Sequence, residues 1–111
     1  MIGALLFSAL LSFISMPAMA DDLAALEKTI IERAERDPET APEYLMSMIE
    51  RRPAPGSEEQ AVYLYGMGLA YERQGDMVEA VEYYRGAELF GHRAAREALV
   101  RLGRPPFPRA P

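Results

Sequence analysis

The side chains that could carry catalysis or hold a metal are few in this sequence. His92 is the only histidine and there is no cysteine, so a structural zinc site lacks its ligands. Two pairs of adjacent carboxylates, Asp21-Asp22 and Glu58-Glu59, stand where helices are expected to begin, which favours interaction with the helix dipole over acid–base chemistry. We therefore predict no catalytic residue, no metal and no cofactor, and we interpret His92 as a turn residue.

A pair of glycines also needs interpretation, because glycine-rich loops can bind phosphate. Gly66-Met67-Gly68 lacks the third glycine of a dinucleotide-binding loop, and no strand is predicted before it. The same residues fit a helix, in which glycine costs about 1 kcal/mol relative to alanine. Close packing of a neighbouring helix against Gly68 is expected to offset that cost.

The first 20 residues form a segment of their own. They contain no charged side chain, are almost wholly apolar from Ile2 to Ile14, and end in Ala18-Met19-Ala20, a pattern that signal peptidase accepts. We predict a signal peptide over residues 1–20 and an exported, periplasmic product. The segment lacks the usual basic start and is long enough to cross a bilayer, so an uncleaved membrane anchor is the alternative.

The remaining chain is sized for one small domain and has an uneven charge. The net charge is −5; residues 21–60 carry 11 acidic and 5 basic side chains, whereas residues 91–111 carry five arginines and one glutamate. An exported acidic protein without a basic aromatic platform is a poor match for nucleic acid, so we predict none bound. The Pro/Arg tail, residues 104–111, is predicted to face solvent or a partner.

Hydrophobic spacing and capping residues predict five helices and no strand. They cover about residues 22–37, 40–51, 57–74, 76–90 and 92–102, with short connections that favour antiparallel neighbours. Asp22, Thr40, Ser57 and Asp76 are the predicted caps, and Gly75 and Gly91 the predicted stops. The predicted inward side of the second helix is Tyr44, Leu45, Met48 and Ile49, and that of the third is Ala61, Leu64, Met67, Gly68 and Tyr71.

Part of this pattern repeats. Leu64 and Met67-Gly68 recur 35 residues later as Leu99 and Leu102-Gly103, a period typical of helical-hairpin solenoids. Residues 61–103 resemble the tetratricopeptide repeat and the related Sel-one-like repeat, with the choice between them open. The positions that match the repeat are Leu64, Gly68, Tyr71, Ala80, Tyr84 and Ala87. The resemblance implies an all-α solenoid over residues 21–103, in which residues 21–52 form a degenerate or capping hairpin before residues 57–103.

The resemblance also implies a binding surface for a protein or peptide. It places one set of residues on the concave side of the third helix: Val62, Tyr65, Leu69, Glu72 and Arg73. Tyr83 is added as an exposed aromatic, because Tyr84 occupies the buried position of the repeat. The alternative is that Val62, Tyr65 and Leu69 pack on the second helix.

These observations predict an exported interaction module, an adaptor or regulator that binds a protein partner in the cell envelope. Two alternatives stay open. The first is a non-catalytic subunit or small enzyme of an envelope complex, and the second is a membrane-tethered structural protein if the leader is retained. Contact with a membrane is expected only in the second case.

Overall fold

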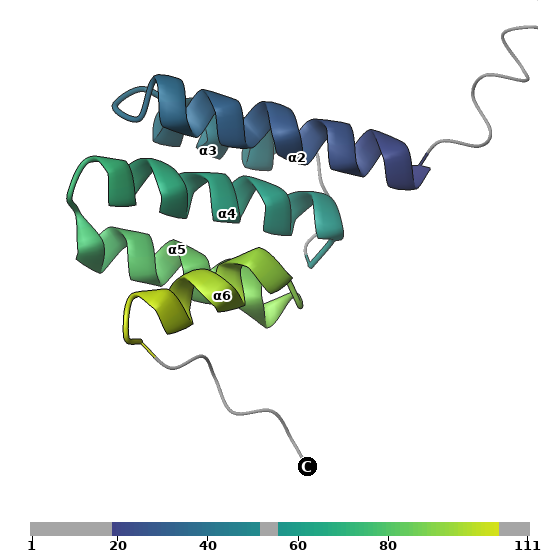
Figure 1. Ribbon diagram of the computed structural model, residues 1–111. Coiled ribbons are helices and arrows are strands. Elements are labelled where there is room, and N and C mark those ends of the chain that lie inside the picture. Colours follow the sequence, from purple (N-terminus) through teal and green to yellow (C-terminus); the bar gives the residue numbers. More distant parts are fainter. Residues whose placement is uncertain (1–18, 52–55, 105–111) are drawn as a thin grey trace, which may run out of the picture.

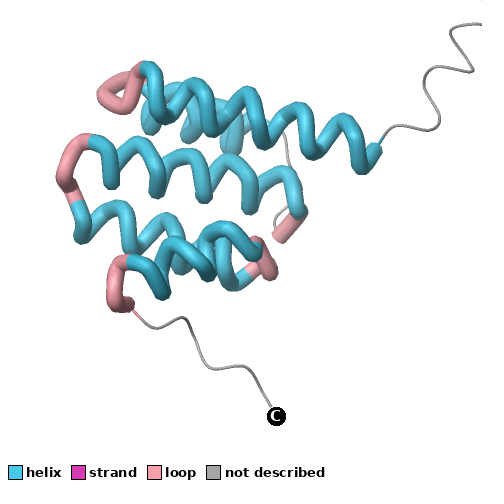
Figure 2. The backbone as a smooth tube through the Cα atoms, in the orientation of Figure 1, coloured by secondary structure: helices cyan, strands magenta, loops and turns pink. Residues whose placement is uncertain are grey.

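The computed structural model describes residues 19–51 and 56–104, and this part of the chain is built from helices and loops (Figures 1 and 2). Five α-helices occupy it: α2 (Met19–Arg36), α3 (Ala41–Arg51), α4 (Glu58–Arg73), α5 (Met77–Leu89) and α6 (Arg93–Arg101). The all-α prediction is confirmed, and within the described residues the five helices correspond one to one with the five predicted. Three parts of the predicted organisation lie wholly or mainly outside the described residues: the leader except for Met19 and Ala20, residues 52–55 between the second and third predicted helices, and the tail after Arg104.

Helix α4 is the centre of the arrangement. Helices α2 and α3 pack on it from one side and α5 packs on it from the other, while α6 packs on α5 (Figure 1). Helices α2 and α3 contact each other far less than each contacts α4. The sequence predicted a single inward side for α4, but its buried residues also include Val62, Tyr63 and Leu69, because neighbours cover it from several directions.

Two glycines explain how α4 accommodates neighbours on both sides. Gly66 and Gly68 are two residues apart, so they project about 200° apart around the helix. A Cβ on Gly66 would collide with Ile30 of α2 and stand 3.0 Å from Leu45 of α3. A Cβ on Gly68 would stand 2.5 Å from the Tyr84 ring of α5. Each glycine therefore allows a different helix to approach the backbone of α4.

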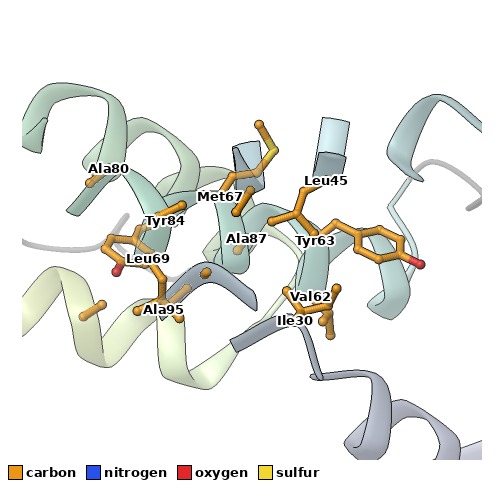
Figure 3. Packing of buried hydrophobic residues seen from close by; sticks show 14 of the residues in the cluster. Ile30, Leu45, Val62, Tyr63, Met67, Leu69, Ala80, Tyr84, Ala87 and Ala95 are labelled. Atoms are coloured by element: carbon orange, nitrogen blue, oxygen red, sulfur yellow. The ribbon is translucent and has the colours of Figure 1, made fainter. Parts of the chain in front are cut away.

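The core lies along these contacts. Its largest fully buried side chains are Tyr63, Tyr84, Leu45, Met67, Leu99 and Val62. Ala80 and Ala87 of α5 are fully buried near Tyr84, where small side chains permit close packing (Figure 3). Tyr44, predicted to be buried, is 40 % exposed instead. The guanidinium of Arg33 lies over its ring at 4.3 Å, so a cation and solvent cover this side chain rather than the core.

Capping residues set most of the helix boundaries. The Ser57 side chain accepts a hydrogen bond from the Gln60 amide at 3.1 Å, and Asp76 accepts one from the Glu79 amide at 3.3 Å, as predicted. Gly75 follows α4 with φ of +81°, a conformation that favours glycine. Helix α2, by contrast, starts at Met19, so Asp22 lies in its first turn and is not its cap.

Across residues 19–51 and 56–104, no helix is both long enough and apolar enough to cross a bilayer.

Candidate functional site

The apolar residues expected on a partner-binding surface of α4 lie inside the molecule. Val62 is 2 % exposed and Leu69 is 9 % exposed, and both belong to the core (Figure 3). Tyr65 is partly buried, with its ring stacked on His92 at a centroid distance of 4.7 Å and tilted against Tyr84 at 5.7 Å. A partner could reach Val62 and Leu69 only by displacing parts of the protein itself, whereas Tyr65 keeps part of its surface exposed.

The two polar residues of the predicted surface are engaged by neighbouring helices. Glu72 accepts two hydrogen bonds from the Arg101 guanidinium, at 2.7 and 2.9 Å, and a third from the Tyr84 hydroxyl at 2.6 Å. The bonds from Arg101 hold the pKa of Glu72 below its usual value, although partial burial opposes this shift. Arg73 forms an ion pair with Glu35 of α2. These contacts connect the end of α4 to α2 and α6.

His92 takes a structural position between α2 and α6. Its Nδ1 accepts a hydrogen bond from the Ala95 amide at 3.2 Å, which makes it the N-cap of α6. Its Nε2 lies 2.8 Å from a carboxylate oxygen of Glu27. Because Nδ1 accepts, the proton of the neutral ring belongs on Nε2, which donates to Glu27. Both ring nitrogens are therefore occupied, and neither is available to a substrate.

Tyr83, the remaining predicted site residue, lies on α5 and is half-buried. Its ring is stacked on Tyr71 with a centroid distance of 5.5 Å and an interplanar angle of 8°. Burial is the largest cause of a raised pKa of the Tyr83 phenol, and the neighbouring Tyr71 and Glu79 raise this pKa further. The phenol is therefore neutral at physiological pH. The expected outward position of Tyr83 is thus only partly realised, since one face of its ring is covered by Tyr71.

The Tyr71–Tyr83 pair forms part of a groove of about 580 Å³ that lies between α3 and the α4–α5 hairpin. We call it the tyrosine groove. The residues that line it are Glu39, Pro42, Glu43, Met46, Ser47, Glu50, Met67, Tyr71, Gln74 and Tyr83. At one end, the Gln74 side chain donates a hydrogen bond to the Pro38 carbonyl at 2.7 Å and connects α4 to the α2–α3 turn.

The chemistry of this groove is acidic and apolar. Glu39, Glu43 and Glu50 line it, whereas no lysine, arginine or histidine does. The ion pairs recorded between described residues involve none of these three carboxylates. Met46 and Met67 supply adaptable apolar surface. The groove can therefore accept a cationic ligand with an apolar component.

Sequence reasoning missed the contribution of α3 to this groove. The signal was present, because Glu43, Met46, Ser47 and Glu50 recur at steps of three and four and therefore share one helix face. The sequence predicted only an inward side for this helix, which comprises Tyr44, Leu45, Met48 and Ile49. Only the packing of α3 against α4 shows that it borders the tyrosine pair.

A second hollow, of about 350 Å³, lies beside the α5–α6 turn and the start of α4. Val62 and His92 line it, together with acidic residues such as Glu27 and the basic Arg93. Its lining carries both signs of charge, so it defines a ligand less clearly than the tyrosine groove does. Among the residues that the structure describes, no cluster of histidine and carboxylate side chains could hold a metal ion.

Comparison with known proteins found no matching family model, no matching curated protein and no matching solved structure. The described part of the chain is an all-helical domain that packs five helices around α4.

Proposed function

We propose that this protein is an exported, non-catalytic interaction module that binds a protein partner in the cell envelope, as an adaptor or regulator. The tyrosine groove carries this proposal. Its volume of about 580 Å³ is in the range of ligand sites, and stacked aromatic rings beside adaptable methionines are typical of peptide-binding surfaces.

The engagement of His92 and Glu72 within the protein supports a binding role over an enzymatic one. The only histidine uses one ring nitrogen to cap α6 and the other to contact Glu27. Glu72 accepts three hydrogen bonds from the protein itself. These side chains hold helices together, and a general acid or base must instead be able to contact its substrate.

We further propose that α4, α5 and α6 form a repeat of the tetratricopeptide or Sel-one-like kind, with α2 and α3 as a capping hairpin. The support is the tight contact of Gly68 with Tyr84 and the full burial of Ala80 and Ala87, positions where the resemblance implies close helix packing. Helix α6 then corresponds to the first helix of a following repeat.

Affinity capture with groove variants tests the proposed function. Tagged wild-type protein is exported, recovered with its partners from cell-envelope extracts, and compared with Tyr83→Ala. The matched control is Tyr44→Ala, which removes a tyrosine that is 40 % exposed and does not line the groove. We expect Tyr83→Ala to lose a specific partner that wild-type protein and Tyr44→Ala retain. Equal capture by all three proteins would contradict binding at this groove, provided that circular dichroism shows each variant to be folded.

A further inference from the structure

One side of the tyrosine groove is a regular row of side chains on α3. Glu43, Met46, Ser47 and Glu50 all line the groove, and their spacing places them on one face of the helix. Glu43 and Glu50 are seven residues apart, which is about 10 Å along a helix that rises 1.5 Å per residue. The backbone positions that carry these two carboxylates therefore stand about 10 Å apart along the groove, with Met46 and Ser47 between them.

The other side of the groove presents the Tyr71–Tyr83 pair. Aromatic-lined grooves bind proline-rich segments in the polyproline II conformation, because this helix is already extended and loses little entropy on binding. A tyrosine face also attracts a guanidinium group, as Arg33 over Tyr44 shows elsewhere in this protein. The tyrosine side thus favours an extended, proline-containing segment and tolerates arginine next to it.

The spacing of Glu43 and Glu50 along α3 is close to the repeat of a polyproline II helix. A polyproline II helix has three residues per turn and rises about 3.1 Å per residue, so residues three apart share a face and stand about 9 Å apart. This distance is within about 1 Å of the separation expected along α3 between Glu43 and Glu50. Two cationic side chains at positions i and i+3 of such a segment would each lie beside one carboxylate. The prolines between them would face the tyrosines.

We infer that the tyrosine groove recognises an extended, proline-containing segment of a partner protein that carries two arginines or lysines three residues apart. This inference rests on the proposed function and specifies the class of partner. The net charge of −5 adds long-range attraction for such a basic segment and repels acidic ones.

Dye-labelled synthetic peptides test the inference directly by fluorescence anisotropy with the purified exported protein. The probe is a nine-residue proline peptide with arginine at positions 3 and 6. One matched peptide has arginine at positions 3 and 5, which keeps composition and charge but turns the second arginine away from the first. Further peptides carry glutamine or glutamate at positions 3 and 6. We expect the 3,6-diarginine peptide to bind at least about threefold more tightly than each of the others, the effect of a surface pair or two.

Protein variants then locate the site. Glu43→Gln combined with Glu50→Gln should weaken binding of the 3,6-diarginine peptide by at least about threefold at low salt, and added salt should shrink this difference. The matched control combines Glu32→Gln with Glu82→Gln, two exposed carboxylates that do not line the groove and whose removal changes the net charge equally. This control should bind within about twofold of the wild type.

The outcomes separate the inference from the proposed function. Equal binding of the two diarginine peptides, no binding of either, or an equal loss in both pairs of variants would overturn the inference. If the glutamine peptide bound as tightly as the diarginine peptide and Tyr83→Ala removed that binding, the groove would still be a peptide site and only its charge preference would be wrong. The envelope capture experiment decides the proposed function independently of these peptides.

Discussion

The ring of Tyr84 on α5 lies directly against Gly68 on α4: a Cβ atom built on Gly68 would stand 2.5 Å from Tyr84 Cδ1 and 2.6 Å from Cε1. Tyr84 is fully buried there, and its hydroxyl donates a hydrogen bond to Glu72 one turn further along α4. Because Gly68 has no side chain, the Tyr84 ring can pass close to α4 and its hydroxyl can reach the Glu72 carboxylate. The hydrogen bond and the burial together raise the pKa of the Tyr84 phenol, with burial the larger cause.

This contact predicts opposite effects for two glycine-to-alanine substitutions. Gly68→Ala should lower the free energy of unfolding by about 1 to 3 kcal/mol, because the new methyl group overpacks against a ring that has no room to move. Gly68→Leu should lower it at least as much. The matched control is Gly86→Ala on α5, whose Cβ would meet Leu64 at an ordinary 3.5 Å. It should raise the free energy of unfolding by about 0.5 to 1 kcal/mol through helix propensity. Urea denaturation measures both; stabilisation by Gly68→Ala would refute the tight α4–α5 contact.

The boundaries of α4 and α5 could be predicted from the sequence because their signals are local. Ser57 and Asp76 each bond to an amide three residues ahead, and Gly75 adopts its turn conformation between the two helices. Each of these features depends on a few neighbouring residues, which a sequence pattern contains in full. The start of α2 was misplaced because the apolar residues before Asp21 were assigned to a leader, although Met19 and Ala20 continue the helix.

The surroundings of the predicted site residues were harder to predict because they depend on contacts between distant residues. His92 meets Glu27, which is 65 residues away in the sequence, and Arg101 meets Glu72, which is 29 away. The periodic spacing of apolar residues along a sequence does not show which of these distant residues contact each other. Tyr65 and Glu72 were predicted to face a partner because a repeat pattern places them on one side of a helix. Which neighbour covers that side depends on how α2 and α6 pack.

The Arg101–Glu72 pair predicts how stability changes in acid. Because the folded state holds the pKa of Glu72 below its ordinary value, this pair stabilises the fold at pH values above the ordinary carboxyl pKa. That stabilisation is lost as the pH falls through the depressed pKa. Glu72→Gln should therefore be less stable than the wild type at pH 7 and lose less further stability on acidification. Urea unfolding at pH 7, 5, 4 and 3 measures this, with the exposed Glu32→Gln as a control that keeps the wild-type slope. Parallel curves for Glu72→Gln and the wild type would refute the prediction.

The leader prediction can be tested by the mass of the exported protein. Cleavage after Ala20 would make Asp21 the first residue and remove two residues of α2, leaving Asp21 and Asp22 in the new first turn, where carboxylates favour the helix dipole. We expect intact mass spectrometry of the soluble exported fraction to give a chain of residues 21–111. Recovery of the full-length chain from membranes alone would instead support the tethered alternative.

Substitutions of the neighbouring residues Tyr83 and Tyr84 should distinguish a position in the core from a position in the proposed groove. Tyr84→Ala leaves a cavity under α4 and should lower the free energy of unfolding by about 3 to 5 kcal/mol, enough to unfold a marginal domain. Tyr84→Phe keeps the ring and removes only the hydroxyl that bonds to Glu72, so this variant should remain folded and less stable than the wild type by about 1 to 3 kcal/mol.

Tyr83→Ala removes a half-buried ring and its stack on Tyr71, so it should lower the free energy of unfolding by only about 1 kcal/mol. For a domain of this size, that corresponds to a fall of about 4 to 8 °C in melting temperature. Its larger effect should be on binding, because half of the stacked pair that lines the groove is lost. Thermal melting and peptide anisotropy on the same samples compare the two effects. Equal destabilisation by Tyr83→Ala and Tyr84→Ala would place Tyr83 in the core and remove the aromatic side of the tyrosine groove as a binding surface.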